Sequence, residues 1–133
     1  MNTPAARATL GRDERLRSPA QFRAVYAAGA RAGDGRLVAY ARASGRGGTR
    51  LGLSVGKRCG KAVARNRIKR LLREAFRQAR ADWPVGYDVV LVTIGRDYTL
   101  EEIRKRLGAL VPEAIRRARR RADAKAGAEG AQA

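Results

Sequence analysis

The residues of this chain with the clearest chemical potential are cations, and they are densest between Lys61 and Arg80. This segment, KAVARNRIKRLLREAFRQAR, holds eight basic residues and a single acid, Glu74. Arginine outnumbers lysine, and a guanidinium can grip a phosphate with two parallel hydrogen bonds or stack on a base. A solvated helix face usually mixes charge signs, whereas like charges three and four residues apart repel one another. Because phosphates would relieve that repulsion, the segment predicts a surface that binds nucleic acid.

A helical period divides the same segment into two faces. Apolar side chains recur at the i, i+3, i+4, i+7 spacing of a helix packed on a core, at Ile68, Leu71, Leu72, Ala75, Phe76 and Ala79. At about 100° per residue, the polar side chains cluster opposite, with Asn66, Arg70, Arg73, Arg77 and Arg80 at the centre and Arg65, Arg67 and Lys69 on the flanks. The pattern predicts that one face anchors the helix while the other contacts RNA.

The rest of the chain offers little material for catalysis by the protein itself. It has no histidine and no clear carboxylate pair, so general acid and base chemistry is not indicated. LGLSVGKR resembles a phosphate loop, but three residues rather than four separate Gly52 from Gly56, and Arg58 stands where Ser or Thr would bind magnesium. Cys59 is the only cysteine, which excludes an internal disulfide and, without histidine, a Cys/His zinc site. We expect a small buried hydrophobe there and no cofactor in the protein.

Composition indicates an acidic partner. The chain has 133 residues and a formal net charge of +18. Self-repulsion of that size opposes the compact state, so solubility alone does not explain it. Nucleic acid fits better than a membrane surface, because the basic helix has one bulky aromatic residue and its apolar stripe is needed for the core. No apolar run approaches the roughly 20 residues that span a bilayer, and no secretion signal is evident, so we expect a cytoplasmic protein without a membrane partner.

Local signals predict an α/β (α+β) two-layer sandwich in the order helix, strand, strand, helix, strand, helix. A helix start at Ser18-Pro19-Ala20-Gln21 is followed by a stop at Gly29. Residues 36–43 and 49–55 alternate as strands and are expected to pair as a hairpin. The near-continuous apolar run 87–94 is expected at the centre of the sheet, covered on both faces.

The last helix is predicted from the capping box of Thr99 and Glu102, with a kink or restart at Pro112. No internal repeat divides the chain. The expected organisation is therefore a flexible basic segment at residues 1–17, a single RNA-binding domain at 18–121 and a disordered tail at 122–133.

The aromatic residues Phe22, Tyr26 and Tyr40 allow two interpretations. Base rates for aromatic side chains favour a place in the core. Alternatively, they form a stacking platform for unpaired bases, and the residues expected on the face of Tyr40 support this, namely Arg36, Val38 and Arg42. Both interpretations stay open at the level of the sequence.

One segment resembles a known family. Residues 50–77, RLGLSVGKRCGKAVARNRIKRLLREAFR, are similar to the signature of the bacterial ribonuclease P protein subunit, whose hallmark stands here as RNRIKR at 65–70. Weaker similarity extends the resemblance over roughly residues 16–111. The resemblance implies a small mixed sheet with a left-handed βαβ crossover. It also implies that the RNA subunit cleaves with bound Mg²⁺, while the protein binds that catalytic RNA and the 5′ leader of precursor tRNA.

The resemblance assigns residues to two sites. Those expected to contact the catalytic RNA are Arg65, Asn66, Arg67, Lys69, Arg70 and Arg73. Those expected in or near the cleft for the leader are Phe22, Tyr26, Val38, Tyr40, Lys57, Arg58 and Lys61. The chain departs from the family pattern at Ile94, where a basic residue is usual, and at Leu37, where an aromatic is common. Arg96, two residues after Ile94, is a possible substitute and is not assigned to either site.

The sequence thus favours an accessory subunit of ribonuclease P, which assists endonucleolytic removal of the leader and leaves the chemistry to the RNA. Its partners would be ribonuclease P RNA and precursor tRNA. The alternative is a ribosomal or general RNA-binding protein, which composition alone would favour. A protein nuclease that acts without RNA is a further rival.

Overall fold

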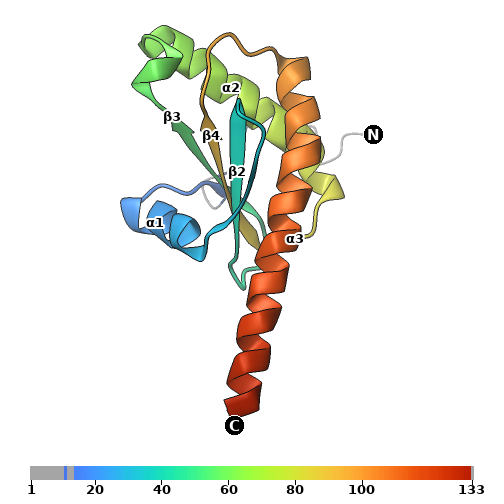
Figure 1. Ribbon diagram of the computed structural model, residues 1–133. Helices are drawn as coiled ribbons and strands as arrows, with labels where there is room; N and C mark the ends of the chain where they lie inside the picture. The colour runs from blue at the N-terminus through green and yellow to red at the C-terminus, as the bar shows by residue number, and fades with distance from the viewer. Residues whose placement is uncertain (1–10, 12–13, 133) are drawn as a thin grey trace.

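The computed structural model describes residue 11 and residues 14–132, with side chains described up to residue 127. A four-stranded sheet forms the centre of the protein, and helices cover it (Figure 1). The elements are, in chain order, α1 (Pro19–Ala28), β1 (Ala30–Gly33), β2 (Leu37–Ala43), β3 (Arg50–Val55), η3 (Lys57–Cys59), α2 (Ala62–Ala79), η4 (Arg80–Asp82), β4 (Tyr87–Thr93) and α3 (Leu100–Gln132). The predicted class and order are confirmed, with β1 as an additional strand.

The sheet corrects the predicted hairpin. Its strand order is β1-β2-β4-β3, so β4 lies between the two strands that were expected to pair. β4 is antiparallel to β2 and parallel to β3. Six of its seven residues are buried, because both of its faces and both of its edges are covered. The prediction failed because the most apolar strand gains most from the central position, whatever the order of strands along the chain.

The actual hairpin joins β1 to β2, and β1 was not predicted from the sequence. Its register pairs Arg31 with Tyr40 and Ala32 with Ala39. Asp34 closes the turn, since its carboxylate accepts hydrogen bonds from the backbone N–H groups of Arg36 and Leu37, both at 3.0 Å. The alternation of Ala and Arg in β1 is a strand pattern, but four residues are too few to distinguish it from a loop.

The main core lies between the sheet and the helices α2 and α3. The predicted apolar stripe of α2 is confirmed: Ile68, Leu72, Ala75 and Phe76 are buried, and Leu71 and Ala79 pack partly buried against the same core. Cys59 is buried as expected, with its Sγ 3.3 Å from Thr93 Oγ1. The parallel strands β3 and β4 are joined through α2, which is the βαβ unit that the family resemblance implies. The left hand of that crossover stays a prediction.

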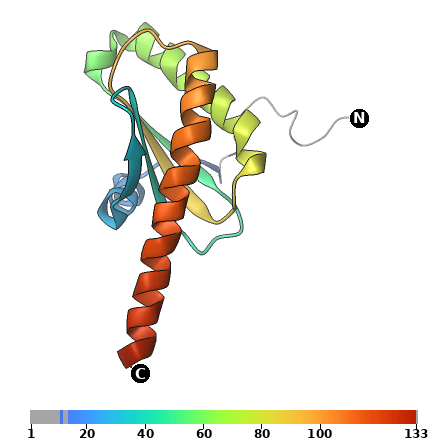
Figure 2. The ribbon, with the colours of Figure 1, turned by 45° about the vertical axis from the view of Figure 1, so that its right-hand side comes forward.

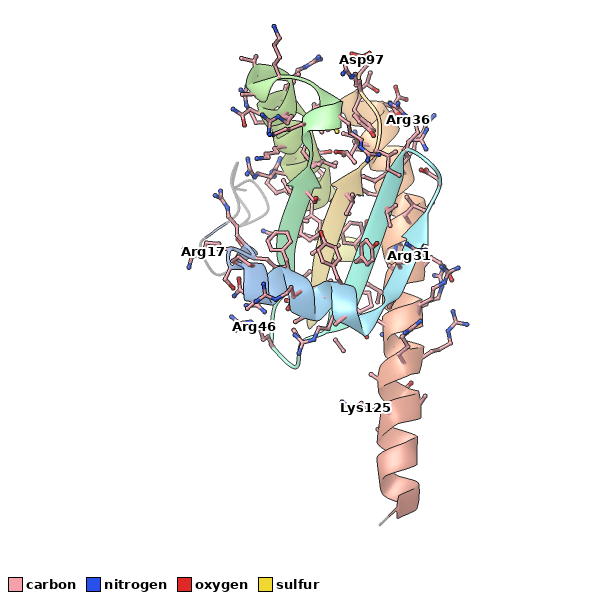
Figure 3. All side chains as sticks on the ribbon, turned by 60° about the vertical axis from the view of Figure 1, so that its left-hand side comes forward. Arg17, Arg31, Arg36, Arg46, Asp97 and Lys125 are labelled. Atoms are coloured by element: carbon pink, nitrogen blue, oxygen red, sulfur yellow. The ribbon has the colours of Figure 1, made fainter. Side chains whose placement is uncertain are left out.

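The opposite face of the sheet carries α1, which begins and ends as predicted (Figure 3). Ser18 Oγ accepts from the N–H of Gln21, and Gln21 Oε1 accepts from the N–H of Ser18. Gly29 caps the other end in the left-handed conformation, at φ 73°. The segment at 1–17 is not flexible throughout, because Leu16 is buried and its N–H bonds the Leu51 carbonyl at 2.9 Å. Residues 1–10, 12 and 13 lie outside the described residues.

α3 differs from its prediction at two places. It runs without a restart through Pro112, and it continues to Gln132 where a disordered tail was predicted. The tail is rich in Ala with Lys, Glu and Gln, which are strong helix formers, and this propensity extends the helix although residues 122–127 are exposed. Figures 1 and 2 show its last turns projecting beyond the sheet. No helix in the described part of the chain is long and apolar enough to cross a membrane.

Candidate nucleic-acid interface

The first half of α2 presents free cations to solvent. Asn66, Arg67 and Arg70 are exposed, and the other three predicted contacts with the catalytic RNA, Arg65, Lys69 and Arg73, are half-buried. Within the described part of the chain, none of these five basic side chains forms an ion pair with a carboxylate. All six predicted residues therefore lie on one helix whose opposite face is fixed in the core.

The C-terminal end of α2 is different, because the arginines there are paired with acids. Arg77 contacts Glu74 at 2.6 Å, and Arg80, just past the helix, contacts Glu14 at the same distance. The hydrogen bond from Arg77 also lowers the pKa of the Glu74 carboxyl, so that this acid stays ionised beside it. The sequence placed Arg77 and Arg80 on the outward face together with Arg70. In the structure both arginines bind acids instead, and the cations of α2 without an ion pair among the described residues are those between Arg65 and Arg73.

Arg73 links α2 to the other face of the protein. Together with Lys69, Arg15 and Phe22 it lines a pocket of about 120 Å³ beside β3. Desolvation lowers the pKa of Arg73, and the charge of Arg15 adds to this. Two guanidinium groups and an ammonium group that share one small pocket repel one another, and an anion placed there would relieve the repulsion.

The aromatic residues are packed partly in the core and partly exposed, and their role as a stacking platform stays a prediction. We define this aromatic face as Phe22, Tyr26, Val38 and Tyr40. The Tyr26 and Tyr40 rings meet edge to face at 4.9 Å between centroids, and the Phe22 and Tyr26 centroids are 6.5 Å apart. Phe22 and Tyr40 also pack against a small second core of Leu16, Val25 and Val90. Yet Tyr26 is 38% exposed and the other three are half-buried, so ring surface remains open to solvent.

Two arginines expected on this face are held by acids instead. Arg36 donates to both carboxylate oxygens of Glu102, at 2.7 and 3.1 Å, and its guanidinium lies 4.3 Å from the centroid of the Tyr98 ring. Arg42 approaches the buried carboxylate of Asp88 at 3.9 Å. Arg50 binds that same carboxylate through two hydrogen bonds of 2.8 and 2.7 Å, across paired positions of β3 and β4. These ion pairs fix the sheet rather than serve an incoming ligand.

The remaining predicted cations follow the carboxyl end of β3. Lys57 and Arg58 in η3 and Lys61 before α2 are exposed. Arg96, left unassigned by the sequence, belongs with them, because its Nε donates to the Arg58 carbonyl oxygen at 2.9 Å. In Figure 3, η3 lies at the top of the sheet face and α1 crosses its lower part. The sheet surface between these two elements is thus bordered by cations on one side and by aromatic rings on the other.

Comparison with known proteins places this geometry in a family. A family model described as Ribonuclease P matches residues 10–115. The chain belongs to the ribonuclease P protein family. The ribonuclease P protein component of Brevibacillus brevis is 44% identical over 82 residues, which are 61% of this chain and 65% of that protein. That of Shouchella clausii is 35% identical over 106 residues, covering 77% of this chain and 87% of its own.

Solved structures agree with the sequence relatives of the ribonuclease P family. The RNase P protein of Staphylococcus aureus superimposes with a TM-score of 0.62 at 30% sequence identity, over 71% of this chain and 89% of that chain. The family match ends at residue 115, so the C-terminal part of α3 lies beyond it. Among the described residues, no cluster of three or more His, Cys, Asp or Glu side chains is arranged to hold a metal ion.

Proposed function

We propose that the protein is the RNA-binding subunit of ribonuclease P and assists removal of the 5′ leader from precursor tRNA. The observation that carries the proposal is the contrast within α2. At the family's signature positions the cations have no carboxylate partner among the described residues, whereas Arg77 and Arg80 farther along are paired. An unpaired row of arginines on a rigid helix suits a folded RNA backbone.

The catalytic RNA binds Arg65, Asn66, Arg67, Lys69, Arg70 and Arg73 in this proposal. The RNA subunit carries the chemistry with its own Mg²⁺, and the protein contributes charge and position. It screens the repulsion between two polyanions and so raises the affinity for substrate and for the metal ions.

The leader lies across the aromatic face in this proposal. Aromatic rings with exposed surface stack on unpaired bases with little preference for sequence, which suits leaders that differ from one tRNA to another. The cations Lys57, Arg58 and Lys61 border the same sheet surface and are suited to the phosphates. Arg96, fixed beside Arg58, would supply the cation that the family usually has at the position of Ile94.

Reconstitution tests the proposed function. The purified chain is combined with a bacterial ribonuclease P RNA and a precursor tRNA at low magnesium. We expect more cleavage at the correct position than the RNA achieves alone. If the protein brings no gain at any magnesium concentration, the proposal fails.

A variant of α2 separates this function from general RNA binding. Arg67→Ala removes an exposed cation from the signature, and Arg104→Ala removes an exposed cation from α3 as a matched control. In a general RNA-binding protein, Arg67→Ala would weaken binding to all RNAs about equally. It would also lower the slope of log affinity against log salt concentration by about one unit. We expect Arg67→Ala to weaken assembly with ribonuclease P RNA selectively, with unrelated RNAs little affected and the control close to wild type.

A further inference from the structure

The part of α3 beyond the family match is strongly basic. From residue 116 to residue 127 it has one acid, Asp123, and the cations Arg116, Arg117, Arg119, Arg120, Arg121 and Lys125. A helix rich in charge is commonly a solvated surface with mixed signs. Here the sign is nearly uniform, and no aromatic or bulky apolar side chain follows Ile115. The stretch therefore has no aromatic ring to stack on bases and no bulky apolar side chain to insert into a membrane, but its cations can contact phosphates.

Two arginines fix this part of α3 against the edge of the sheet. Arg117 Nη1 donates to the backbone carbonyl of Arg31 in the edge strand β1. Arg121 Nη1 donates to the carbonyl of Ala28 at the end of α1, at 3.0 Å. The helix thus lies along β1 and beside the end of α1 before it projects past the sheet (Figures 2 and 3).

This edge is continuous with the aromatic face. α1 crosses the sheet with Phe22 over Gly52 in β3 and Tyr26 against Tyr40 in β2. The next strand is β1, where Arg31 is paired in register with Tyr40 and its Nη1 lies 3.5 Å from the Tyr40 hydroxyl. Arg117 of α3 lies next to Arg31, because it donates a hydrogen bond to the Arg31 carbonyl oxygen. A path along α1 therefore leads from Phe22 through Tyr26 and Tyr40 to the arginines of α3.

The charges at this edge are only partly neutralised. Glu113 is the one carboxylate among the described residues that pairs with arginines here, and it is shared by three of them, Arg116, Arg117 and Arg120. Their side chains remain 62%, 47% and 70% exposed. One negative charge opposite three positive charges leaves a net positive edge that is accessible to a ligand. We define the basic edge as Arg31, Arg117 and Arg120.

We propose that the basic edge binds phosphates of leader nucleotides that lie upstream of those on the aromatic face. This inference rests on the proposed function and extends it to a further site. Its direction follows from the strand order, because α2 and its pocket lie beside β3 and the basic edge lies at β1, on the opposite side of the sheet. The catalytic RNA, which cleaves the leader, binds α2 in the proposed function, so the nucleotides near the cleavage site lie near α2. A leader that crosses the sheet from there therefore reaches β1 with its upstream end.

The test measures how affinity depends on leader length. The full chain, assembled with a bacterial ribonuclease P RNA, is titrated with precursor tRNAs whose leaders lengthen one nucleotide at a time. The test variant is Arg117→Gln with Arg120→Gln. The control variant is Arg104→Gln with Lys105→Gln, which removes the same charge from exposed positions near the start of the same helix. The readout is the ratio of the dissociation constants for the shortest and longest leaders.

In wild type and control, we expect affinity to rise in two stages as the leader lengthens. The first stage comes when the leader reaches the aromatic face, and the second when it reaches the basic edge. The second stage should be missing in the test variant. The salt slope of the wild type for the longest leader should exceed that of the test variant by about 1.4, because each single-strand phosphate contact contributes about 0.7. If the test variant keeps the wild-type ratio, or if the wild-type gain ends with the first stage, the basic edge is not a leader site and the proposed function stands. If the leader has no effect at any length, the proposed leader binding fails as well.

Discussion

Gly52 determines where Phe22 can lie on the sheet. A Cβ atom at this position would come within 2.8 and 2.9 Å of two atoms of the Phe22 ring and 3.1 Å from a Leu16 methyl group. Gly52 is paired in register with Val90 of the central strand, and the ring over Gly52 packs against the small core that contains Val90. The absence of a side chain in β3 is therefore what allows α1 to bring an aromatic ring down onto the sheet.

We predict that Gly52→Ala destabilises the protein and displaces Phe22. Two contacts under 3 Å with the Phe22 ring and one of 3.1 Å with the buried Leu16 require α1 to move. Overpacking of this kind costs about 1–3 kcal/mol. Urea denaturation measures the loss. Gly47→Ala is the control, since no atom lies within 4 Å of a Cβ there. Equal midpoints for Gly52→Ala and wild type would show that α1 adjusts freely and that the ring position does not depend on Gly52.

At the scale of elements, features that depend on residues close together in the sequence were predicted, whereas the pairing of distant strands was not. The stripe of α2 and the cap of α1 depend on residues within one or two turns of each other, and both are confirmed. The partner of β2 could not be predicted in this way, because β4 follows it by more than 40 residues. Pairing between distant strands depends on which strand buries most, and alternation within one strand does not reveal it.

The candidate sites divide in the same way. The family resemblance assigned six positions to the catalytic RNA, and the helical period predicted that one helix carries them, as it does. That Arg80 pairs with Glu14 could not be predicted, since 66 residues separate them. The basic edge was missed for a related reason. Arg31 and Arg117 meet only because β1, itself too short to recognise, becomes the edge of the sheet along which α3 lies.

The start of α3 is tied to β2 by a carboxylate whose ionisation should affect stability. Glu102 accepts hydrogen bonds from Arg36 and from Arg106, and the hydrogen bond from Arg36 is the main reason that its pKa lies below the ordinary value of 4.5. A carboxyl whose pKa falls on folding contributes stability above its unfolded pKa. That contribution is lost as the pH falls through the folded value.

We predict that Glu102→Gln is less stable than wild type at neutral pH and that this difference narrows below about pH 4.5, the ordinary value of the carboxyl. The glutamine cannot form the ionic contacts at any pH, whereas wild type loses them only in acid. Thermal unfolding followed by circular dichroism between neutral and acidic pH gives the comparison. Glu101→Gln changes the exposed neighbour in the same turn and serves as control. A difference from wild type that is constant across the pH range would contradict the ionic explanation.

At the scale of the whole molecule, ion pairs and free cations occupy different places. Arg36, Arg50 and Arg80 are bonded to acids that hold elements together. The first half of α2 and the basic edge keep an excess of positive charge at opposite sides of the sheet. The acids are thus used in ion pairs that hold the fold together. The excess of cations, a net charge of +18, is available to polyanions.

This separation predicts that salt acts on folding and on RNA binding with opposite signs. Between roughly 50 and 200 mM salt, screening should raise the melting temperature of the free protein. Over the same range, affinity for ribonuclease P RNA should fall by roughly 500-fold if the five signature cations contact phosphates. Differential scanning calorimetry and filter binding measure the two effects.

A variant of lower charge provides the control. Replacing the exposed residues Arg46, Arg104 and Lys105 by Gln lowers the net charge from +18 to +15. This variant should melt higher at low salt and gain less from added salt. A melting temperature that falls with salt in both proteins would mean that ion pairs contribute more to stability than self-repulsion removes. Repulsion among the free cations would then not destabilise the free protein, and RNA binding could not relieve it.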